Sequence, residues 1–234
     1  MFIQFPKELV HGYLIKRYKR FLADIKLDNG EVITAHCTNS GSMKSCLEDS
    51  AEVYLSPVND PNRKTKFTWE MIKINNDWVG INTSVPNRIA LEYIKHNVIK
   101  GLEGYTFVKR EVTYGDSRFD IYAENESEKC FIEVKNVTLK VGDYARFPDA
   151  QTVRGQKHLE TLIQLKARGI RAVMLYIIQR TDVNTFGPAW DIDPNYSRIL
   201  QKAYNAGVEI FPFQVRVKPD GIEPLGIIPF SLEQ

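Results

Sequence analysis

Cysteine is scarce in this chain, with three residues in 234. Cys37, Cys46 and Cys130 are an odd number, lie far apart and include no Cys-x-x-Cys pair. A disulfide framework needs pairs of cysteines, and a zinc knuckle needs closely spaced ones. The sequence supports neither, and it indicates a protein of a reducing compartment.

Long apolar runs are also absent. One of the longest, residues 172–178 (AVMLYII), is far shorter than the roughly 20 apolar residues of a membrane-spanning helix. Residues 1–8 (MFIQFPKE) have no basic segment followed by an apolar run, which is the pattern of an export leader. We therefore expect a cytoplasmic protein with no membrane partner.

An excess of one charge is almost missing from the chain as a whole, whose net charge is +2. The distribution is uneven, because residues 139–180 hold eight basic and three acidic side chains. This block favours an anionic ligand, although a solvated helix face rich in lysine and arginine explains it as well. With 43% hydrophobic and 26% charged residues, the composition excludes wholesale disorder.

Strand-like alternation fills the first third of the sequence. Residues 21–27 (FLADIKL) alternate apolar and polar side chains, and residues 28–30 (DNG) supply a hairpin turn. Further strands are expected at residues 13–18, 31–36, 51–56, 67–74 and 78–82. Five or six short strands without a helical pattern predict a small β-barrel domain at residues 1–83.

From residue 84 onward, helical and strand patterns alternate. Ser84 is expected to cap a helix that has Pro86 in its first turn and that Gly101 and Gly104 end. The later elements expected are strands at residues 106–114, 118–123 and 129–135, a helix at 149–167, a strand at 171–178, a helix at 194–205 and a strand at 208–217. This αβββαβαβ order predicts a mixed sheet covered by helices, in an α/β domain at residues 84–234.

Two carboxylates and a lysine form the most informative pattern. In residues 130–135 (CFIEVK), alternation places Glu133 and Lys135 on the same side of one strand, and Asp120 lies among apolar residues on the preceding strand. Carboxylates on adjacent strands suit a hard divalent cation, and a neighbouring lysine can orient water or neutralise charge on a phosphate. Taken alone, however, a Glu-x-Lys pair on a strand is usually a solvated ion pair.

These residues resemble the PD-(D/E)XK nuclease core, and a larger set of motifs resembles the sugar fermentation stimulation protein A family. The matching segments follow in order at residues 14–24, 39–43, 118–120, 133–139, 147–150 and 154–159. Ser40 departs from the family pattern, which more usually has threonine, but it keeps a hydroxyl. The resemblance implies a five-stranded OB-fold barrel, a PD-(D/E)XK nuclease-like domain and binding to DNA.

The resemblance also implies roles for individual residues. Asp120 and Glu133 become ligands of Mg²⁺ or Mn²⁺, and Lys135 becomes the catalytic lysine. Glu92 matches the acidic residue of the first core helix as a third ligand, and Gln156 matches a polar catalytic position on the helix facing the site. Read from the residues alone, Glu92 is equally well a surface glutamate paired with a nearby lysine, and Gln156 an amide that caps a backbone group.

Cations in three segments are candidate contacts to DNA phosphates. In the barrel they are interleaved with aromatic residues, as on OB surfaces that bind single strands, although alternation divides them between two faces. The candidates are Arg17, Lys19, Arg20, Arg63, Lys64, Arg154, Lys157 and His158. A solvated helix or loop explains each of them taken singly.

Two further features have open interpretations. Residues 38–43 (TNSGSM) form a small polar loop that suits a phosphate cradled by backbone N–H groups, or simply a tight turn that needs the positive φ of Gly41. Asp149 is expected to be the N-cap of the helix that follows it.

The leading hypothesis is a cytoplasmic DNA-binding protein with a Mg²⁺-dependent, phosphodiester-hydrolysing site, and many nucleases of this fold work as homodimers. The alternative is a non-catalytic DNA-binding regulator of sugar-utilisation genes, a role that rests on the resemblance alone. A third hypothesis is a hydrolase of small phosphodiesters that uses the same metal centre. Dependence on metal separates catalysis from binding.

Overall fold

The first part of the chain folds into a closed barrel of five strands. The structure is a computed structural model that describes residues 1–234. The pairing order is β4-β3-β2-β5-β6, and a bridge between β4 and β6 closes the barrel. A hairpin adds β7 (Asp77–Gly80) to β6. The barrel strands are β2 (Val10–Tyr18), β3 (Leu22–Leu27), β4 (Val32–His36), β5 (Glu52–Pro57) and β6 (Phe67–Ile74). The predicted five-stranded barrel is confirmed.

Alternation along each strand builds the core of the barrel. In β3, Ala23, Ile25 and Leu27 are buried while the residues between them are half-buried or exposed. Trp69 of β6 fills the centre, and its indole N–H donates to the carbonyl of Met71 at 2.9 Å. Each large apolar side chain buried in this way contributes about 1.5–3 kcal/mol, so the pattern itself stabilises the barrel.

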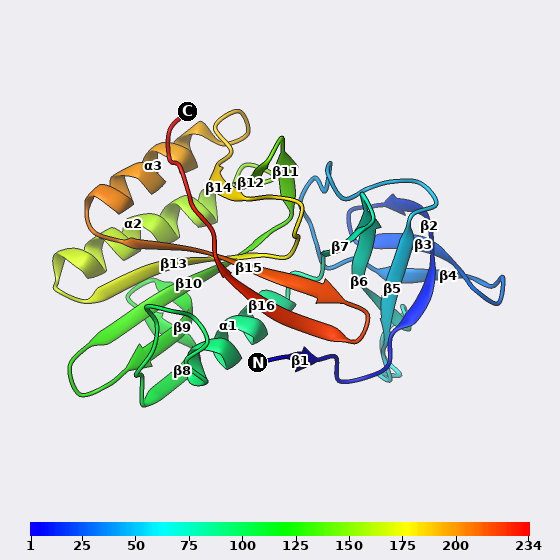
Figure 1. Cartoon of the computed structure of the whole chain (residues 1–234), viewed down its shortest axis with the longest axis horizontal. Helices are drawn as coiled ribbons and strands as arrows, with labels where there is room; N and C mark the ends of the chain where they lie inside the picture. Colours follow the sequence, from blue (N-terminus) through cyan, green and yellow to red (C-terminus); the bar gives the residue numbers. More distant parts are fainter.

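The second part of the chain is a seven-stranded mixed sheet in the order β1-β16-β15-β13-β10-β9-β8, with helices on both faces. Helix α1 packs on one face, and α2 and α3 pack on the other (Figure 1). The strands are β1 (Ile3–Gln4), β8 (Phe107–Tyr114), β9 (Ser117–Glu124), β10 (Lys129–Val137), β13 (Arg171–Ile178), β15 (Glu209–Lys218) and β16 (Gly221–Ile227). The helices are α1 (Val85–Lys95), α2 (Val153–Ala167) and α3 (Pro194–Asn205).

The continuous apolar run of β13 is explained by its central place in this sheet. β13 pairs in parallel with β10 on one side and with β15 on the other. Val173 and Leu175 belong to the core beneath α1, whereas Met174 and Tyr176 belong to the core beneath α2 and α3. A strand covered on both faces has no polar side, so it reads as a short apolar run.

Several short strands were not predicted. β1 comes from the start of the chain but pairs with β16, and thus extends the sheet of the second domain. A separate three-stranded sheet, in the order β11-β12-β14, lies beside the barrel (Figure 1). Its strands are β11 (Leu139–Val141), β12 (Tyr144–Phe147) and β14 (Thr185–Pro188). Strands of two to four residues are too short to show alternation, which is why the sequence gives no sign of them.

The helix ends also differ from the sequence prediction. α1 ends at Lys95, so Gly101 and Gly104 lie beyond it, both at positive φ. α2 begins at Val153, and its N-cap is Thr152, whose hydroxyl accepts from Gly155 N at 3.0 Å. The prediction that Asp149 is the N-cap was wrong, because Asp149 lies in a bend that precedes the helix and Thr152 takes the capping position. None of the three helices has the length and apolar character of a membrane span.

Candidate functional site

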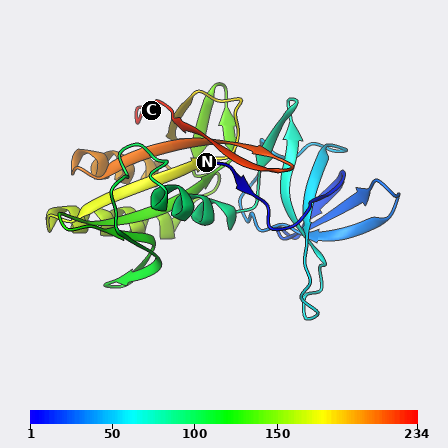
Figure 2. The same cartoon turned by 60° about the horizontal axis from the view of Figure 1, so that its bottom comes forward.

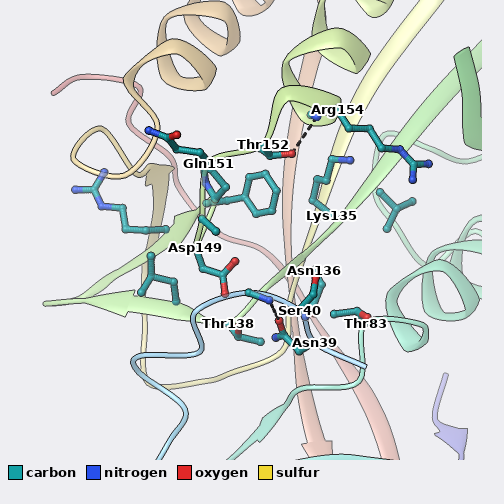
Figure 3. A pocket seen from close by; sticks show the side chains of 18 of the residues that line it. Asn39, Ser40, Thr83, Lys135, Asn136, Thr138, Asp149, Gln151, Thr152 and Arg154 are labelled. Atoms are coloured by element: carbon teal, nitrogen blue, oxygen red, sulfur yellow. Dashed lines mark hydrogen bonds between the residues drawn. The ribbon is translucent and has the colours of Figure 1, made fainter. Parts of the chain in front are cut away.

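A polar cleft of about 600 Å³ lies where the barrel meets the second domain. One wall is the barrel loop at residues 39–41, and the other walls are β9, β10 and the connection from β12 to α2 at residues 147–155. In Figure 3, Lys135 and Arg154 lie on the side of the cleft opposite Asn39 and Ser40. The predicted residues Asp120, Glu133 and Lys135 all line this cleft.

Asp120 is held on β9 by two hydrogen bonds. Asn87 Nδ2 of α1 donates to its Oδ1 at 2.8 Å, and the backbone N–H of Val134 donates to its Oδ2 at 2.9 Å. Burial and the negative charge of Glu133 raise the pKa of Asp120, while the ammonium group of Lys135 opposes the rise. A cation beside Asp120 would favour its charged form.

Glu133 is buried on β10 with 2% of its side chain exposed. Its Oε1 accepts from Lys135 Nζ and contacts Nδ1 of His158, which comes from α2. Burial disfavours the carboxylate, but the positive charge of Lys135 and the hydrogen bond with His158 outweigh it and lower the pKa of Glu133. The two carboxylates therefore have pKa values shifted in opposite directions, although they share one cleft.

The donor set fits a divalent cation that keeps water ligands. Glu133 Oε2 is buried and has no hydrogen-bond partner, which leaves a charged oxygen unsatisfied. Burying such an oxygen is costly unless a donor or a cation compensates it. No group of three or more histidine, cysteine, aspartate or glutamate side chains gathers in metal-binding geometry. Asp120 and Glu133 are thus the protein ligands available, and Mg²⁺ is commonly held by one or two carboxylates.

Glu92 does not line the cleft. It is half-buried on α1, and its carboxylate lies 3.8 Å from the ring of His96. The residue of α1 that reaches the site is Asn87, which binds Asp120. Glu92 follows Asn87 by five residues, which advance a helix by about 140° around its axis beyond one full turn. Because Asn87 faces the site, Glu92 lies on a different face of α1.

Gln156 is likewise outside the cleft, although it lies on the predicted helix. Its Nε2 donates to both carboxylate oxygens of Asp193, at 3.0 and 3.1 Å. Asp193 also accepts from Thr152 N and Tyr196 N, at 2.9 Å each. Since Asp193 is the N-cap of α3, Gln156 joins the starts of α2 and α3. Its partner is a side-chain carboxylate, so the structure does not show the backbone cap that the sequence left open as an alternative.

Two of the eight predicted DNA contacts, Arg20 and Arg154, line the cleft. Lys19 and Lys157 are exposed neighbours that do not line it, and the same holds for Lys64 on the connection from β5 to β6. That connection projects from the barrel in Figure 2. For these three cations, contact with DNA stays a prediction.

Three other predicted contacts have partners within the protein. His158 is 5% exposed and bound to Glu133, so it is not available to a phosphate, and this prediction is corrected. Arg17 donates from Nη2 to the carbonyls of Asn39 at 2.8 Å and Gly41 at 3.0 Å. Arg63 is half-buried, and its longest-range hydrogen bonds are 3.4 Å contacts to threonine hydroxyls of its own hairpin. Sequence alternation gave no sign of the partners of His158 and Arg17, since these partners lie far away along the chain.

Gly41 is required for a different reason from the one expected. Its φ is not positive. Instead, a Cβ there would lie 2.0 Å from Oδ2 and 2.3 Å from Oδ1 of Asp149. The Asp149 carboxylate therefore packs directly on the glycine, and its Oδ2 accepts from Met43 N at 3.4 Å. Asp149 joins the barrel loop to the second domain.

Gly41→Ala is expected to lower the free energy of unfolding by about 1–3 kcal/mol, because overpacking forces the loop and Asp149 apart. Urea unfolding followed by fluorescence measures the change. Adding Asp149→Ala to this variant removes the clash and is expected to recover part of the loss. Equal stability of Gly41→Ala and the unmodified protein would contradict the close packing.

Two family models cover most of the chain. Residues 15–81 match the SfsA N-terminal OB domain, and residues 84–221 match the Sugar fermentation stimulation protein RE domain. The structure is also similar to a solved one, described as the structure of Pyrococcus furiosus SfsA in complex with Ca²⁺. The TM-score is 0.89 at 26% sequence identity, over 98% of each chain.

Curated relatives are similar over nearly the full length. A sugar fermentation stimulation protein homolog of Geotalea uraniireducens is 46% identical over 225 residues, which is 96% of this chain and 97% of the relative. The homolog of Geotalea daltonii is 47% identical over the same shares of both chains. A homolog of Paramagnetospirillum magneticum is 48% identical over 94% of each chain.

Proposed function

The chain belongs to the sugar fermentation stimulation protein family, and we propose that it binds DNA and hydrolyses phosphodiester bonds with Mg²⁺ or Mn²⁺. The observation that carries this proposal is the unpartnered buried oxygen of Glu133, beside Lys135 and Asp120 in an accessible polar cleft. The relative from Pyrococcus furiosus, described in complex with Ca²⁺, supports a divalent cation in this family.

The reaction adds water across the phosphodiester. The bond from phosphorus to one ester oxygen breaks, a bond to the water oxygen forms, and the leaving oxygen takes up the proton. A bound divalent cation supplies positive charge that polarises the phosphate. Lys135 holds an ammonium group at the cleft wall, where it can donate to the attacking water or to a phosphate oxygen as negative charge develops.

The remaining side chains orient these groups. Asn87 and the N–H of Val134 fix the carboxylate of Asp120, and His158 fixes the carboxylate of Glu133 from behind. Such fixed neighbours keep ligands oriented without cost at the moment of reaction. Arg20 and Arg154 face the cleft from opposite domains and can contact phosphates on each side of the cleaved bond.

A cleavage assay tests the proposal directly. Labelled single-stranded, duplex and branched DNA is incubated with the protein in Mg²⁺, in Mn²⁺ or in EDTA. We expect cutting that requires metal and disappears in Asp120→Ala, because that variant lacks the carboxylate oxygens that would bind the divalent cation. Asp220→Ala, a change at an exposed turn residue, serves as the matched control and is expected to cut normally. DNA that is retarded in a gel but stays uncut with either metal would indicate a binding protein without chemistry.

A further inference from the structure

A second pocket, of about 210 Å³, lies where the chain passes between the two domains. The chain makes this passage twice, once from β1 to β2 and once from β7 to α1 (Figure 1). Phe5 and Pro6 of the first connection line the pocket, and so do Asn82 and Ser84 of the second. We call this space the junction pocket. No residue that lines it also lines the cleft, so the two are separate.

The side chain of Arg88 lines the junction pocket and has an unused donor. Arg88 is half-buried on α1, and its Nε is buried without a hydrogen-bond partner. Leaving a buried N–H of a charged group without an acceptor is costly. A guanidinium group presents its donors as a flat fork that matches the two oxygens of a carboxylate. The junction pocket therefore lacks an acceptor beside Arg88.

Glu70 of β6 lines the same pocket but does not supply that acceptor. It is 7% exposed, and its Oε1 accepts from Ser56 Oγ at 2.5 Å. Its Oε2 accepts from Asn82 Nδ2 at 2.8 Å. Burial raises the pKa of Glu70, while these two hydrogen bonds and the charge of Arg88 oppose the rise. Because burial disfavours the carboxylate form, Glu70 balances the charge of Arg88 only in part.

The size and the apolar lining of the junction pocket narrow the class of ligand. Its volume is that of about seven water molecules at roughly 30 Å³ each, which suits a ligand of a few non-hydrogen atoms. Phe5 and Val85 give it apolar walls against which a short hydrocarbon group can pack. Phosphate groups carry more than one negative charge near pH 7, so Glu70 disfavours them more than it disfavours a singly charged carboxylate.

Two asparagine side chains lie between the junction pocket and the cleft. Asn82, which lines the pocket, accepts from Thr38 Oγ1 at 3.1 Å, and Thr38 leads into the barrel loop that forms one wall of the cleft. Asn87 directly precedes Arg88 on α1 and donates to Asp120 Oδ1 at 2.8 Å. A ligand bound to Arg88 thus contacts the segment that positions both the barrel loop and Asp120.

We propose that the junction pocket binds a small monocarboxylate. Its carboxylate accepts from the guanidinium group of Arg88, and its short apolar group lies against Phe5 and Val85. This site is separate from the cleft, so the inference does not rest on the proposed function. Because such a ligand contacts segments of both domains, its binding stabilises the folded protein.

Titration calorimetry and thermal unfolding of the full chain at pH 7 and constant ionic strength test the ligand class. The probes are sodium propionate, inorganic phosphate and propionamide, which has nearly the shape of propionate without its charge. We expect propionate to bind saturably and to raise the unfolding temperature, and both other probes to bind about tenfold more weakly or less. Absence of saturable propionate binding would overturn the inference. Equal or tighter binding of propionamide or of phosphate would overturn it as well.

Variants of α1 test the place of binding. Arg88→Met keeps the apolar stem of the side chain but removes the guanidinium group, so we expect propionate affinity to fall about tenfold or more. Lys95→Met removes an exposed cation from the last turn of the same helix and is expected to change the affinity less than about twofold. Arg88→Lys keeps the charge without the fork and is expected to bind propionate more weakly than the unmodified protein.

Thermal unfolding without propionate shows which of these variants are folded. Unchanged propionate affinity in a folded Arg88→Met would overturn the inference, and so would an equal loss in Lys95→Met. If Arg88→Met does not fold, Arg88→Lys decides the question, and unchanged affinity in that variant would then overturn the inference.

Discussion

Glu133→Gln is expected to lower the rate of metal-dependent hydrolysis by about 10²–10³-fold or more, the cost of losing one oriented charged group at a reacting centre. Glutamine has nearly the same shape, so the packing on β10 is retained. The variant loses the negative charge that pairs with Lys135 and that, in the proposed function, would bind the cation through an unpartnered oxygen. Binding of DNA in EDTA is expected to change less than threefold, because no phosphate contact is removed.

The matched control is Glu128→Gln, which makes the same chemical change in another carboxylate. Glu128 bonds Arg171 and Tyr105 and does not line the cleft. Initial cleavage rates and titration calorimetry with Mn²⁺ give two independent readouts. We expect Mn²⁺ affinity to fall at least tenfold in Glu133→Gln and to hold in the control. Cleavage at the normal rate by Glu133→Gln would place the activity at another site.

Features that depend on neighbouring residues along the chain could be predicted from the sequence. The alternation that buries Ala23 and Ile25 is a property of one strand, and from it the barrel could be predicted. The same two-residue period put Glu133 and Lys135 on one side of β10. Their approach to Asp120 followed as well, because β9 and β10 are consecutive antiparallel strands.

Features that depend on contacts between distant segments could not be predicted. Asn87 and Glu92 lie on the same helix, and only the packing of α1 decides which of them faces β9. His158 looked like one of several surface groups on α2, yet it is buried because Glu133, 25 residues earlier, lies beneath it. Asp149 has a side chain typical of an N-cap, but Thr152 takes that place and Asp149 contacts the barrel loop.

Arg180 is the clearest case of a group whose role only the fold reveals. Its side chain is 1% exposed. Nη1 donates to Thr138 O at 2.6 Å and to Ser45 Oγ at 3.2 Å, and Nε and Nη2 bond the two carboxylate oxygens of Asp182. Ser45 lies two residues beyond the barrel loop at residues 38–43, and Thr138 lines the cleft. One buried guanidinium therefore connects the barrel, the cleft wall and the connection that follows β13.

Burial opposes ionisation of Asp182, but the hydrogen bonds and charge of Arg180 outweigh it and lower the pKa of Asp182 to about 2. A carboxyl whose pKa is lower in the folded state stabilises the fold above its unfolded pKa of about 3.9. That contribution is lost as the pH falls from about 4 toward about 2. We therefore expect part of the acid destabilisation of this protein to come from Asp182, and Asp182→Asn to flatten that part of the stability curve.

Arg180→Met is expected to lower the free energy of unfolding at pH 7 by about 3 kcal/mol, because it leaves Asp182 and Thr138 O without their buried donor. Asp182 still pairs with Lys140 Nζ at 3.2 Å. We therefore expect the loss in free energy of unfolding to lie near the lower end of the range for broken buried ion pairs. Arg216→Met, which breaks a 2.7 Å pair whose arginine side chain is 45% exposed, is the control and is expected to cost less than about 1 kcal/mol. Urea unfolding of both variants measures the difference, and equal costs would contradict the central place of Arg180.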